Sequence, residues 1–507
     1  MTSDADPSET VFHLSEVLAR SAERFGDRAA LVVKERTLSY RELDESASRL
    51  ARGLALDVGI ASGDRVAVQM PNSWEYVVTF FALARLGAVV VPLSVMLTPA
   101  EVRHVAGDAA VRVVLASRLK STALAQLVGS SPVTRIVTLA GGVPGPPPTM
   151  DSLLLGGSAA ASPKSGTALS HAPDDVAAII YTSATSGSPR GAELTHRGLC
   201  TNAAMSAQVH GRTSSDVTVT ALPLPHVYGN MVLVATLLSG GTLVLLKQFS
   251  ETETLSSIAR YEATLLDGVP AMYRHLVGYP ALASFDLSSL RRCTVGGADI
   301  ALEELETFEA RFGVPMLELW GATELSGVVM SRRTDGLRRA GSYGRLLPGH
   351  ELRVVDASDP TIVLPEGETG ELSIRGPMVM RGYCGDERAT AEVKDESGWL
   401  RISTIGRVDA DGFVHVLDTT RRLVNTGGYK VYPAEVERVI ASHGGVLEAL
   451  VVGENDAMRG AVAQAYVVVA PGAEVTSSEI LALCQRELAA YKVPASVTFV
   501  AALPARS

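Results

Sequence analysis

Apolar and polar positions alternate with two periods in the first part of the chain. Residues 14–25 and 74–86 place apolar side chains at helical spacing, whereas residues 65–69 and 88–92 are short apolar runs typical of buried strands. Residues 37–40 add a short strand that turns into a helix at residue 41. Strands alternating with helices favour parallel sheets covered by helices. The pattern therefore predicts an α/β fold.

The pattern changes after residue 340. Short strands separated by turns are expected at residues 351–356, 370–375 and 412–417, and they predict a β-rich subdomain. We expect a large N-terminal domain of residues 1–417, built of parallel α/β subdomains plus this β-rich one. A small α+β C-terminal domain of residues 418–507 would follow on a hinge. Stretches rich in Gly, Pro and Ser at 141–148 and 156–166 predict exposed connections.

Composition narrows the class of protein. A chain of 507 residues is too long for one core, and 47% hydrophobic with 20% charged residues is typical of a globular protein. The net charge of −10 argues against a nucleic-acid or acidic-membrane partner. Four scattered cysteines without a C-x-x-C pair indicate reduced thiols. We expect a cytoplasmic protein with no leader and no membrane span, and the oligomeric state stays open.

Residues 181–191 are chemically the most informative segment. The apolar run 176–180 predicts a buried strand, which leads into Tyr-Thr-Ser-Ala-Thr-Ser-Gly-Ser-Pro-Arg-Gly. Backbone N–H groups converging in a glycine-containing turn bind anions, and hydroxyls add neutral donors. A flexible Ser/Thr linker has a similar composition but does not need a hydrophobic strand leading into it. We therefore expect a polyphosphate site, although the Walker spacing is absent.

Four later segments add to this loop. They are Leu-Pro-Leu-Pro-His-Val-Tyr-Gly at 222–229, Arg-Cys-Thr-Val-Gly-Gly-Ala-Asp at 292–299, Leu-Trp-Gly-Ala-Thr-Glu at 319–324 and Gly-Gly-Tyr-Lys-Val-Tyr-Pro at 427–433. Taken singly, His226, Trp320 and Glu324 have ordinary structural readings in a loop, a core and a helix surface. Taken in order, the five segments resemble the motifs of the adenylate-forming superfamily, which includes acyl-CoA synthetases, luciferases and peptide-synthetase adenylation domains.

The resemblance implies a two-step ligase reaction. A small-molecule carboxylic acid, aryl or medium-chain, would attack the α-phosphorus of ATP and give an acyl-adenylate and pyrophosphate. The C-terminal domain would then swing about a hinge at Asp418, and a thiol such as that of CoA would take the acyl group. ATP and Mg²⁺ are the expected cofactors, with CoA as co-substrate.

The resemblance also implies roles for individual residues. The implied catalytic residues are His226, Thr323, Glu324 and Arg190, and the implied Mg²⁺ ligands are Glu324 and Thr185. The implied nucleotide-binding residues are Thr182, Ser183, Thr185, Ser186, Gly187, Gly297, Ala298, Asp299, Trp320, Gly321, Thr323, Thr404 and Arg421. The implied acid pocket comprises His226, Tyr228, Gly229, Gly296, Gly321 and Ser326, and the implied acceptor tunnel comprises Gly428, Tyr429 and Lys430.

Departures from the family pattern concern residues that would touch the nucleotide. In the loop, Ala184, Ser186 and Arg190 replace glycine, threonine and lysine. Thr404 stands where relatives have an aspartate that binds the ribose, and Thr419 stands where they have an arginine. A hydroxyl makes one hydrogen bond where a carboxylate makes a charge-assisted pair, so nucleotide affinity falls by about 1–3 kcal/mol.

The last departure is at the end of the sequence. The pattern Leu-Pro-Arg-x-x-x-Gly-Lys becomes Leu-Pro-Ala-Arg-Ser at 503–507, and Arg506 is the cation nearest to the expected lysine. A trimmed tail accounts for this difference but not for Thr404 or Thr419. Two alternatives to acid activation stay open. One is adenylation of a non-carboxylate oxyanion such as nitrite, which diazotises an aryl amine in natural-product biosynthesis, and the other is a binding protein that has lost adenylation.

Overall fold

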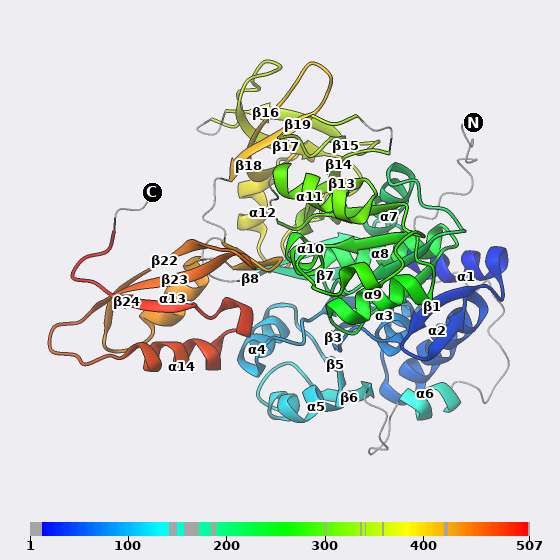
Figure 1. Ribbon diagram of the computed structural model, residues 1–507. Helices are drawn as coiled ribbons and strands as arrows, with labels where there is room; N and C mark the ends of the chain where they lie inside the picture. The colour runs from blue at the N-terminus through cyan, green and yellow to red at the C-terminus, as the bar shows by residue number, and fades with distance from the viewer. Residues whose placement is uncertain are drawn as a thin grey trace.

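The computed structural model describes residues 13–140, 150–156, 172–183, 189–298, 300, 302–334, 337–339, 341–356, 359–419, 424–431 and 433–504. In these ranges the strands form four sheets, two large ones in the body of the molecule and two smaller ones nearer the C-terminus. Figure 1 shows the last sheet and its helices projecting from the body. The predicted α/β class is confirmed.

The first large sheet has the strand order β6-β5-β3-β4-β7-β8 and is parallel except for its last pair, β7 and β8. Its strands are β3 (Arg65–Gln69), β4 (Val89–Pro92), β5 (Val113–Ser117), β6 (Arg135–Ala140), β7 (Val176–Ser183) and β8 (Pro189–Thr195). The helices of this part are α1 (Leu14–Phe25), α2 (Tyr40–Gly53), α3 (Trp74–Leu86), α4 (Pro99–Asp108), α5 (Arg118–Leu124) and α6 (Met150–Gly156).

The second large sheet has the order β15-β14-β13-β12-β11-β9-β10-β1-β2, parallel from β13 to β1 and antiparallel at both ends. Its strands are β1 (Ala29–Val33), β2 (Arg36–Ser39), β9 (Val217–Thr220), β10 (Thr242–Leu245), β11 (Leu265–Gly268), β12 (Arg292–Val295), β13 (Met316–Ala322), β14 (Gly327–Ser331) and β15 (Arg345–Leu346). The accompanying helices are α7 (His196–Val209), α8 (Val227–Leu238), α9 (Glu251–Arg260), α10 (Pro270–Val277) and α11 (Leu302–Phe312).

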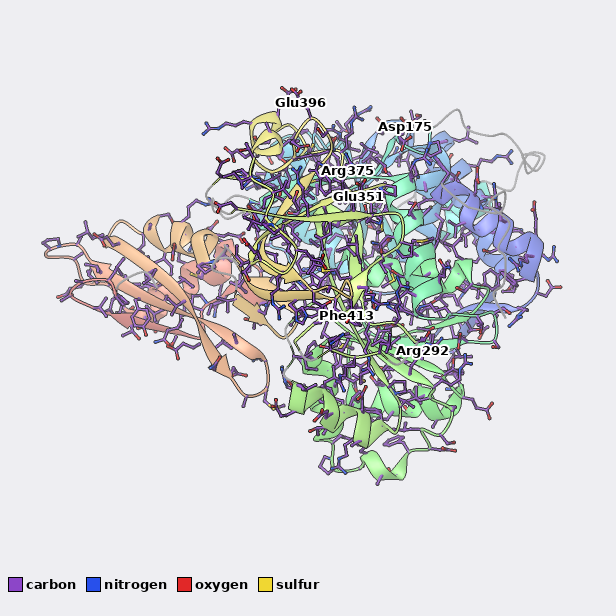
Figure 2. The ribbon with its side chains drawn as sticks, turned by 90° about the horizontal axis from the view of Figure 1, so that it is seen from above. Asp175, Arg292, Glu351, Arg375, Glu396 and Phe413 are labelled. Carbon is purple, nitrogen blue, oxygen red and sulfur yellow. The ribbon has the colours of Figure 1, made fainter. Side chains whose placement is uncertain are left out.

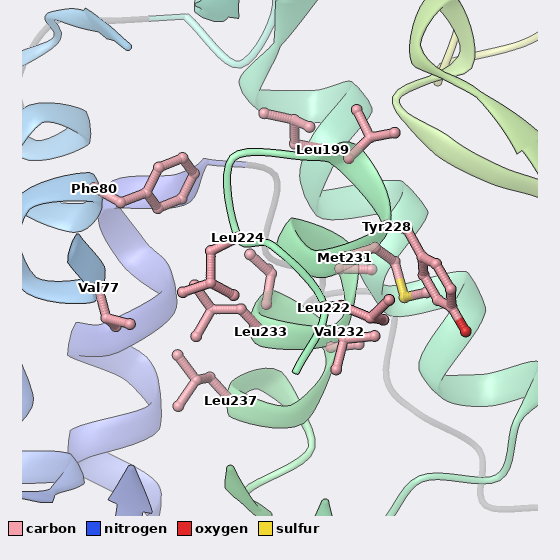
Figure 3. Close-up of a cluster of buried hydrophobic side chains, with 14 of the residues drawn as sticks. Val77, Phe80, Leu199, Leu222, Leu224, Tyr228, Met231, Val232, Leu233 and Leu237 are labelled. Atoms are coloured by element: carbon pink, nitrogen blue, oxygen red, sulfur yellow. The ribbon is translucent and has the colours of Figure 1, made fainter. Parts of the chain in front are cut away.

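Helices α3 and α8 join the cores of the two large sheets. Helix α3 contacts β4, and α8 contacts β10 of the other sheet. Figure 3 shows Val77 and Phe80 of α3 facing Leu224 and Leu233 on the side of α8. Helix α8 is apolar almost all round because it is buried on every side, as expected for a central helix.

The two smaller sheets follow in the chain. The β-rich part is an antiparallel sheet of β16 (Glu351–Val355), β17 (Gly370–Arg375), β18 (Leu400–Val408) and β19 (Val414–Thr419), with α12 (Glu387–Val393) beside it. Arg375 at the end of β17 forms an ion pair with Glu351 at the start of β16, at 2.7 Å, and Figure 2 shows the two side chains together. The β-rich region predicted after residue 340 is thus observed.

Residues 424–431 and 433–504 form what we call the C-terminal unit. It contains β20 (Val424–Thr426), β21 (Tyr429–Val431), β22 (Val446–Asp456), β23 (Gly460–Val469) and β24 (Ser496–Phe499), with α13 (Pro433–Ala441), α14 (Ser477–Glu487) and a 3₁₀ turn at Ala490–Lys492. Its helices and sheet enclose a separate cluster of buried apolar side chains. The unit therefore has a core of its own, as the predicted small domain requires.

Candidate active site

A cavity of about 1110 Å³ lies where the body of the molecule meets the C-terminal unit. Both parts contribute to its lining. The predicted site residues in the lining are Thr182, His226, Tyr228, Gly229, Gly297, Thr323, Glu324, Gly428 and Tyr429. Most of these residues lie at the carboxyl ends of strands or directly after them, which is where open α/β sheets bind ligands.

The described ends of the segment predicted to bind phosphate line this cavity. Strands β7 and β8 pair in antiparallel register, with Thr182 opposite Arg190 and Ser183 opposite Pro189. Thr182 and Pro189, at the two ends of the connection, both line the cavity that Glu324 also lines. The loop residues Thr185, Ser186 and Gly187 lie outside the described residues, as do Asp299 and Arg421.

Strand β8 has a second neighbour besides β7. The backbone of residues 381–384 runs along it: Cys384 N donates to Gly191 O at 2.7 Å, and Glu193 N donates to Gly382 O at 2.9 Å. The same short segment carries Tyr383 toward the cavity side. One stretch of chain thus joins the loop-bearing strand to the residues around Glu324.

Glu324 is hydrogen-bonded to this segment through Tyr383. The Tyr383 hydroxyl donates to Glu324 Oε1 at 3.0 Å, which orients the carboxylate. Arg190 lies over the Tyr383 ring, 5.4 Å from its centroid, and its Nε is 3.6 Å from Asp386 Oδ2. Arg190 therefore belongs to the same cluster, with an aromatic ring and a carboxylate as its described contacts.

The carboxylate of Glu324 fits a magnesium ion that is shared with a substrate. Among the described residues, no group of three or more His, Cys, Asp or Glu side chains could hold a metal alone. Glu324 instead presents a single carboxylate to the cavity. Mg²⁺ usually takes one or two carboxylates and fills its other positions with water and substrate phosphates. Thr185, the second predicted ligand, is not among the described residues.

His226 is placed by the helix that follows it. It is the N-cap of α8, and its Nδ1 accepts a hydrogen bond from Tyr228 N at 3.2 Å. A neutral imidazole that accepts at Nδ1 carries its proton on Nε2. The imidazole ring lines the cavity.

Behind the cavity wall lies a buried polar network that holds Tyr228. The Tyr228 hydroxyl is 2.7 Å from Thr294 Oγ1, and Thr294 donates to Asp267. Asp267 accepts two hydrogen bonds from Arg212 Nη2, at 2.6 and 2.8 Å, and both side chains of this ion pair are almost completely buried. Burial raises the pKa of the Tyr228 phenol well above its ordinary value, so the ring is a neutral wall.

Several predicted glycines are required for packing. A Cβ on Gly296 would lie 2.1 Å from Leu319 Cδ1, and one on Gly321 would lie 2.0 Å from Gly327 O. A Cβ on Gly229 would lie 2.3 Å from Pro223 O. Among the predicted glycines that the structure describes, Gly297 alone, with φ +83° and a nearest neighbour at 3.5 Å, combines a left-handed backbone with space beside it. Gly296, which the resemblance assigns to the acid pocket, is therefore packed against Leu319 and is not among the residues that line the cavity.

Other predicted residues lie outside the cavity lining. Trp320 on β13 and Ala298 are partly buried. Ser326 is buried, and its hydroxyl donates to Met378 O at 2.8 Å. Thr404 is buried on β18, and its hydroxyl donates to Ile402 O at 3.1 Å. In this arrangement Thr404 is hydrogen-bonded within its own strand.

The β20–β21 turn carries the residues predicted for the acceptor tunnel, and its Gly428 and Tyr429 line the cavity. Gly428, with φ +85°, approaches Val269 so closely that a Cβ would lie 3.0 Å from a Val269 methyl group. Tyr429 stacks on Tyr491, with ring centroids 4.6 Å apart, and burial raises the pKa of both phenols, that of Tyr491 to about 12. Lys430 pairs with Asn425 through its backbone, and the predicted hinge residue Asp418 lies opposite Ile405 at the end of β19.

Sequence reasoning missed several residues around the site. Tyr383, Asp386 and the ion pair of Lys492 with Glu101 became visible only in the fold. Asp267 left a signal, because a carboxylate inside the apolar run Leu265–Gly268 indicates a buried partner. None of the helices in the described ranges is long and apolar enough for a membrane span.

Comparison with known proteins agrees with this geometry. Residues 18–384 match the family AMP-binding enzyme, and residues 435–507 match the AMP-binding enzyme C-terminal domain. The chain is 35% identical to a feruloyl-CoA synthase of Amycolatopsis, over 92% of this chain and 91% of that protein. It is also 35% identical to an indoleacetate–CoA ligase of Aromatoleum aromaticum, over 97% and 95% of the two chains.

Among solved structures, the amide bond synthetase McbA from Marinactinospora thermotolerans superposes with a TM-score of 0.85 at 29% identity, covering 97% of this chain and 96% of that one. The resemblance seen in five short motifs therefore extends over nearly the whole length. The chain belongs to the AMP-binding enzyme family of adenylate-forming enzymes and is an adenylating enzyme of the acyl-CoA ligase type.

Proposed function

We propose that the chain activates an aryl or medium-chain carboxylic acid with ATP and Mg²⁺ and transfers the acyl group to CoA. One observation carries this proposal: a single cavity is lined by His226, Thr323 and Glu324 of the body and by Gly428 and Tyr429 of the C-terminal unit. Its volume of about 1110 Å³ is slightly above the roughly 300–1000 Å³ of ordinary ligand pockets. Such a space suits an acid, a nucleotide and part of an acceptor.

The acid end of the cavity supports an apolar substrate. Its lining includes Met70, Leu93, Phe249 and Met272, and Tyr228 adds a neutral aromatic face. Two relatives are named for ferulate and indoleacetate, which are both aryl acids. Small apolar increments in a pocket are worth about 1–3 kcal/mol each, so an aryl group gains most of its affinity here.

The chemistry follows from these positions in two steps. A carboxylate oxygen attacks the α-phosphorus of ATP, the bond to the bridging oxygen breaks, and pyrophosphate leaves. In this proposal His226 contacts the acid and the Thr323 hydroxyl contacts the α-phosphate, and both residues line the cavity. Mg²⁺ held by Glu324 would offset charge on the leaving group. The thiol sulfur of CoA then attacks the acyl carbon, AMP leaves, and the thiol proton passes to solvent.

ATP–pyrophosphate exchange tests the first step. The protein is incubated with ATP, labelled pyrophosphate and one of ferulate, indoleacetate or octanoate, and thioester formation is then followed after CoA is added. We expect exchange with at least one acid and a CoA thioester of the same acid. If no acid supports exchange and ATP does not bind, the proposal is wrong.

The same assay tests the role of Glu324. Glu324→Ala is expected to lower Mg²⁺-dependent exchange at least 100-fold, because one misplaced or missing electrostatic group costs about that much. The fold should persist, since Glu324 is only partly buried and accepts a single described side-chain hydrogen bond. Glu351→Ala, which removes an exposed carboxylate paired with Arg375, is the control and should keep full activity. Unaltered exchange in Glu324→Ala would contradict the assigned role.

Nitrite is the second candidate substrate. The Thr404 hydroxyl donates to Ile402 O within its own strand, at the position where the family pattern has a ribose-binding aspartate. A small oxyanion needs less clamping than an acyl chain. AMP release that requires nitrite together with an aminoaryl acid, and not the acid alone, would select this candidate.

A further inference from the structure

The C-terminal unit is held against the body by a buried ionic contact. Lys492 Nζ lies 3.1 Å from Glu101 Oε1 of α4 and 2.8 Å from Glu435 Oε1 of α13. Lys492 is 4% exposed, and the side chains of Glu101 and Glu435 are 10% and 2% exposed. Burial lowers the pKa of the Lys492 ammonium, but Tyr491 and the two carboxylates together raise it above its ordinary value, so the group is charged.

The two carboxylates differ in one respect. Glu435 and Lys492 belong to the same unit, so their contact persists wherever that unit turns. Glu101 belongs to the body, so its contact with Lys492 exists only in the present orientation. If the unit turns away, Lys492 keeps Glu435, and Glu101 keeps the hydrogen bonds that its Oε2 accepts from Thr98 N and Thr98 Oγ1. Neither charge is then left buried and uncompensated, so the contact can open at moderate cost.

The present orientation places the β20–β21 turn at the cavity. Lys492 directly follows Tyr491, which stacks on Tyr429 of that turn. Gly428 of the same turn touches Val269 of the body. Lys492, Tyr491, Tyr429 and Gly428 all line the cavity. The Lys492–Glu101 contact is therefore connected by a short run of packed side chains to the part of the cavity lining that the β20–β21 turn provides.

We propose that Lys492 and Glu101 are positioning residues that select the orientation in which the acyl group is transferred. The expected effect on acyl transfer rests on the proposed function, whereas the expected effect on the orientation of the C-terminal unit does not. The ion pair favours the arrangement with the β20–β21 turn at the cavity and is broken in any arrangement used for adenylation. Removing the Glu101 charge should therefore slow transfer and leave adenylation intact.

Glu101→Gln makes this separation testable. Glu101 is the third residue of a capping box with Thr98, and glutamine serves that role as well as glutamate. The variant thus loses the charge and keeps the helix cap. Glu479→Gln is the matched control, because Glu479 has the same place in the capping box of α14 and is exposed.

Two rates are measured with the best acid of the panel above. In Glu101→Gln we expect ATP–pyrophosphate exchange within twofold of wild type, and a rate of transfer from preformed acyl-adenylate to CoA that is about tenfold lower. Glu479→Gln should change neither rate. Equal loss of both rates in Glu101→Gln, or no loss of transfer, would overturn the proposal.

A distance measurement tests the orientation without any substrate. The four native cysteines are buried, so spin labels will attach to Leu119→Cys on α5 and Leu447→Cys on β22, two exposed positions. We expect the distance of this structure to be well populated in the labelled parent and to lose at least half of its population in Glu101→Gln but not in Glu479→Gln. An unchanged distribution, or a parent that lacks this distance, overturns the inference. Absence of exchange with every acid would overturn only the proposed function.

Discussion

The buried pair of Arg212 and Asp267 provides a quantitative test of how the cavity wall at Tyr228 is supported. Its side chains are 1% and 0% exposed, and Asp267 accepts from both Arg212 and Thr294. In Asp267→Asn the guanidinium stays buried while its counter-charge is gone. Breaking a buried pair in this way costs about 3–5 kcal/mol. The same change weakens the hydrogen bond from Thr294, because its acceptor is no longer charged, and Thr294 also contacts the hydroxyl of Tyr228, which lines the cavity.

The loss in free energy of unfolding is measured as the shift in the urea midpoint, at an unchanged slope of the free energy against urea concentration. Asp27→Asn removes half of an exposed pair with Arg41 and should change the free energy of unfolding by less than about 1 kcal/mol. The double variant Arg212→Met with Asp267→Leu should regain most of the loss, because no charge is left buried. A midpoint shift for Asp267→Asn as small as that for Asp27→Asn, or a double variant no better than the single one, would refute the reasoning.

Three further predictions concern stability and the site. Ser403 has φ +51° on β18, a strained value for a residue with a Cβ, so Ser403→Gly should raise the free energy of unfolding by about 1 kcal/mol, whereas Ser397→Gly should not. Burial lowers the pKa of His210 to about 3. Below about pH 6.5 the unfolded chain takes up a proton at His210 and the folded chain does not. Lowering the pH from 7 to 5 should therefore reduce the free energy of unfolding of wild type by about 2 kcal/mol more than that of His210→Gln, as judged by urea midpoints. Tyr383→Phe should slow exchange by less than Glu324→Ala does and raise the Mg²⁺ concentration for half-maximal rate, and an unchanged Mg²⁺ dependence would contradict the orienting role.

Helices and strands whose bounds depend on residues nearby in the sequence were predictable. The helices α1 (Leu14–Phe25) and α3 (Trp74–Leu86) have the predicted bounds. The signals that set these bounds are local, because the apolar period lies in the helix and the N-cap and the terminal glycine lie next to it. Strands 65–69 and 370–375 were likewise predicted with their observed bounds. The family motifs then indicated His226, Thr323 and Glu324, and the structure brings these residues to one cavity.

Contacts between distant residues were not predictable in this way. Tyr383 meets Glu324 across 59 positions, and Lys492 meets Glu101 across 391 positions. No local period or cap encodes such a pair, because it depends on how sheets and units are assembled. The packing reason for Gly296 was missed for the same cause, since Leu319 reaches it from the neighbouring strand.

Strand β8 has a hydrogen-bonded neighbour on each side, and this limits which segments can be exchanged between this enzyme and its relatives. The strand is bound to β7 on one side and to residues 381–384 on the other, and the latter bring Tyr383 to Glu324. A graft of the loop with β7 and β8 alone would place foreign side chains against residues 381–384. A chimera should therefore exchange residues 176–195 and 381–386 together. The length of β8 should also be kept, because an insertion of a single residue would turn Arg190 to the opposite face of the sheet.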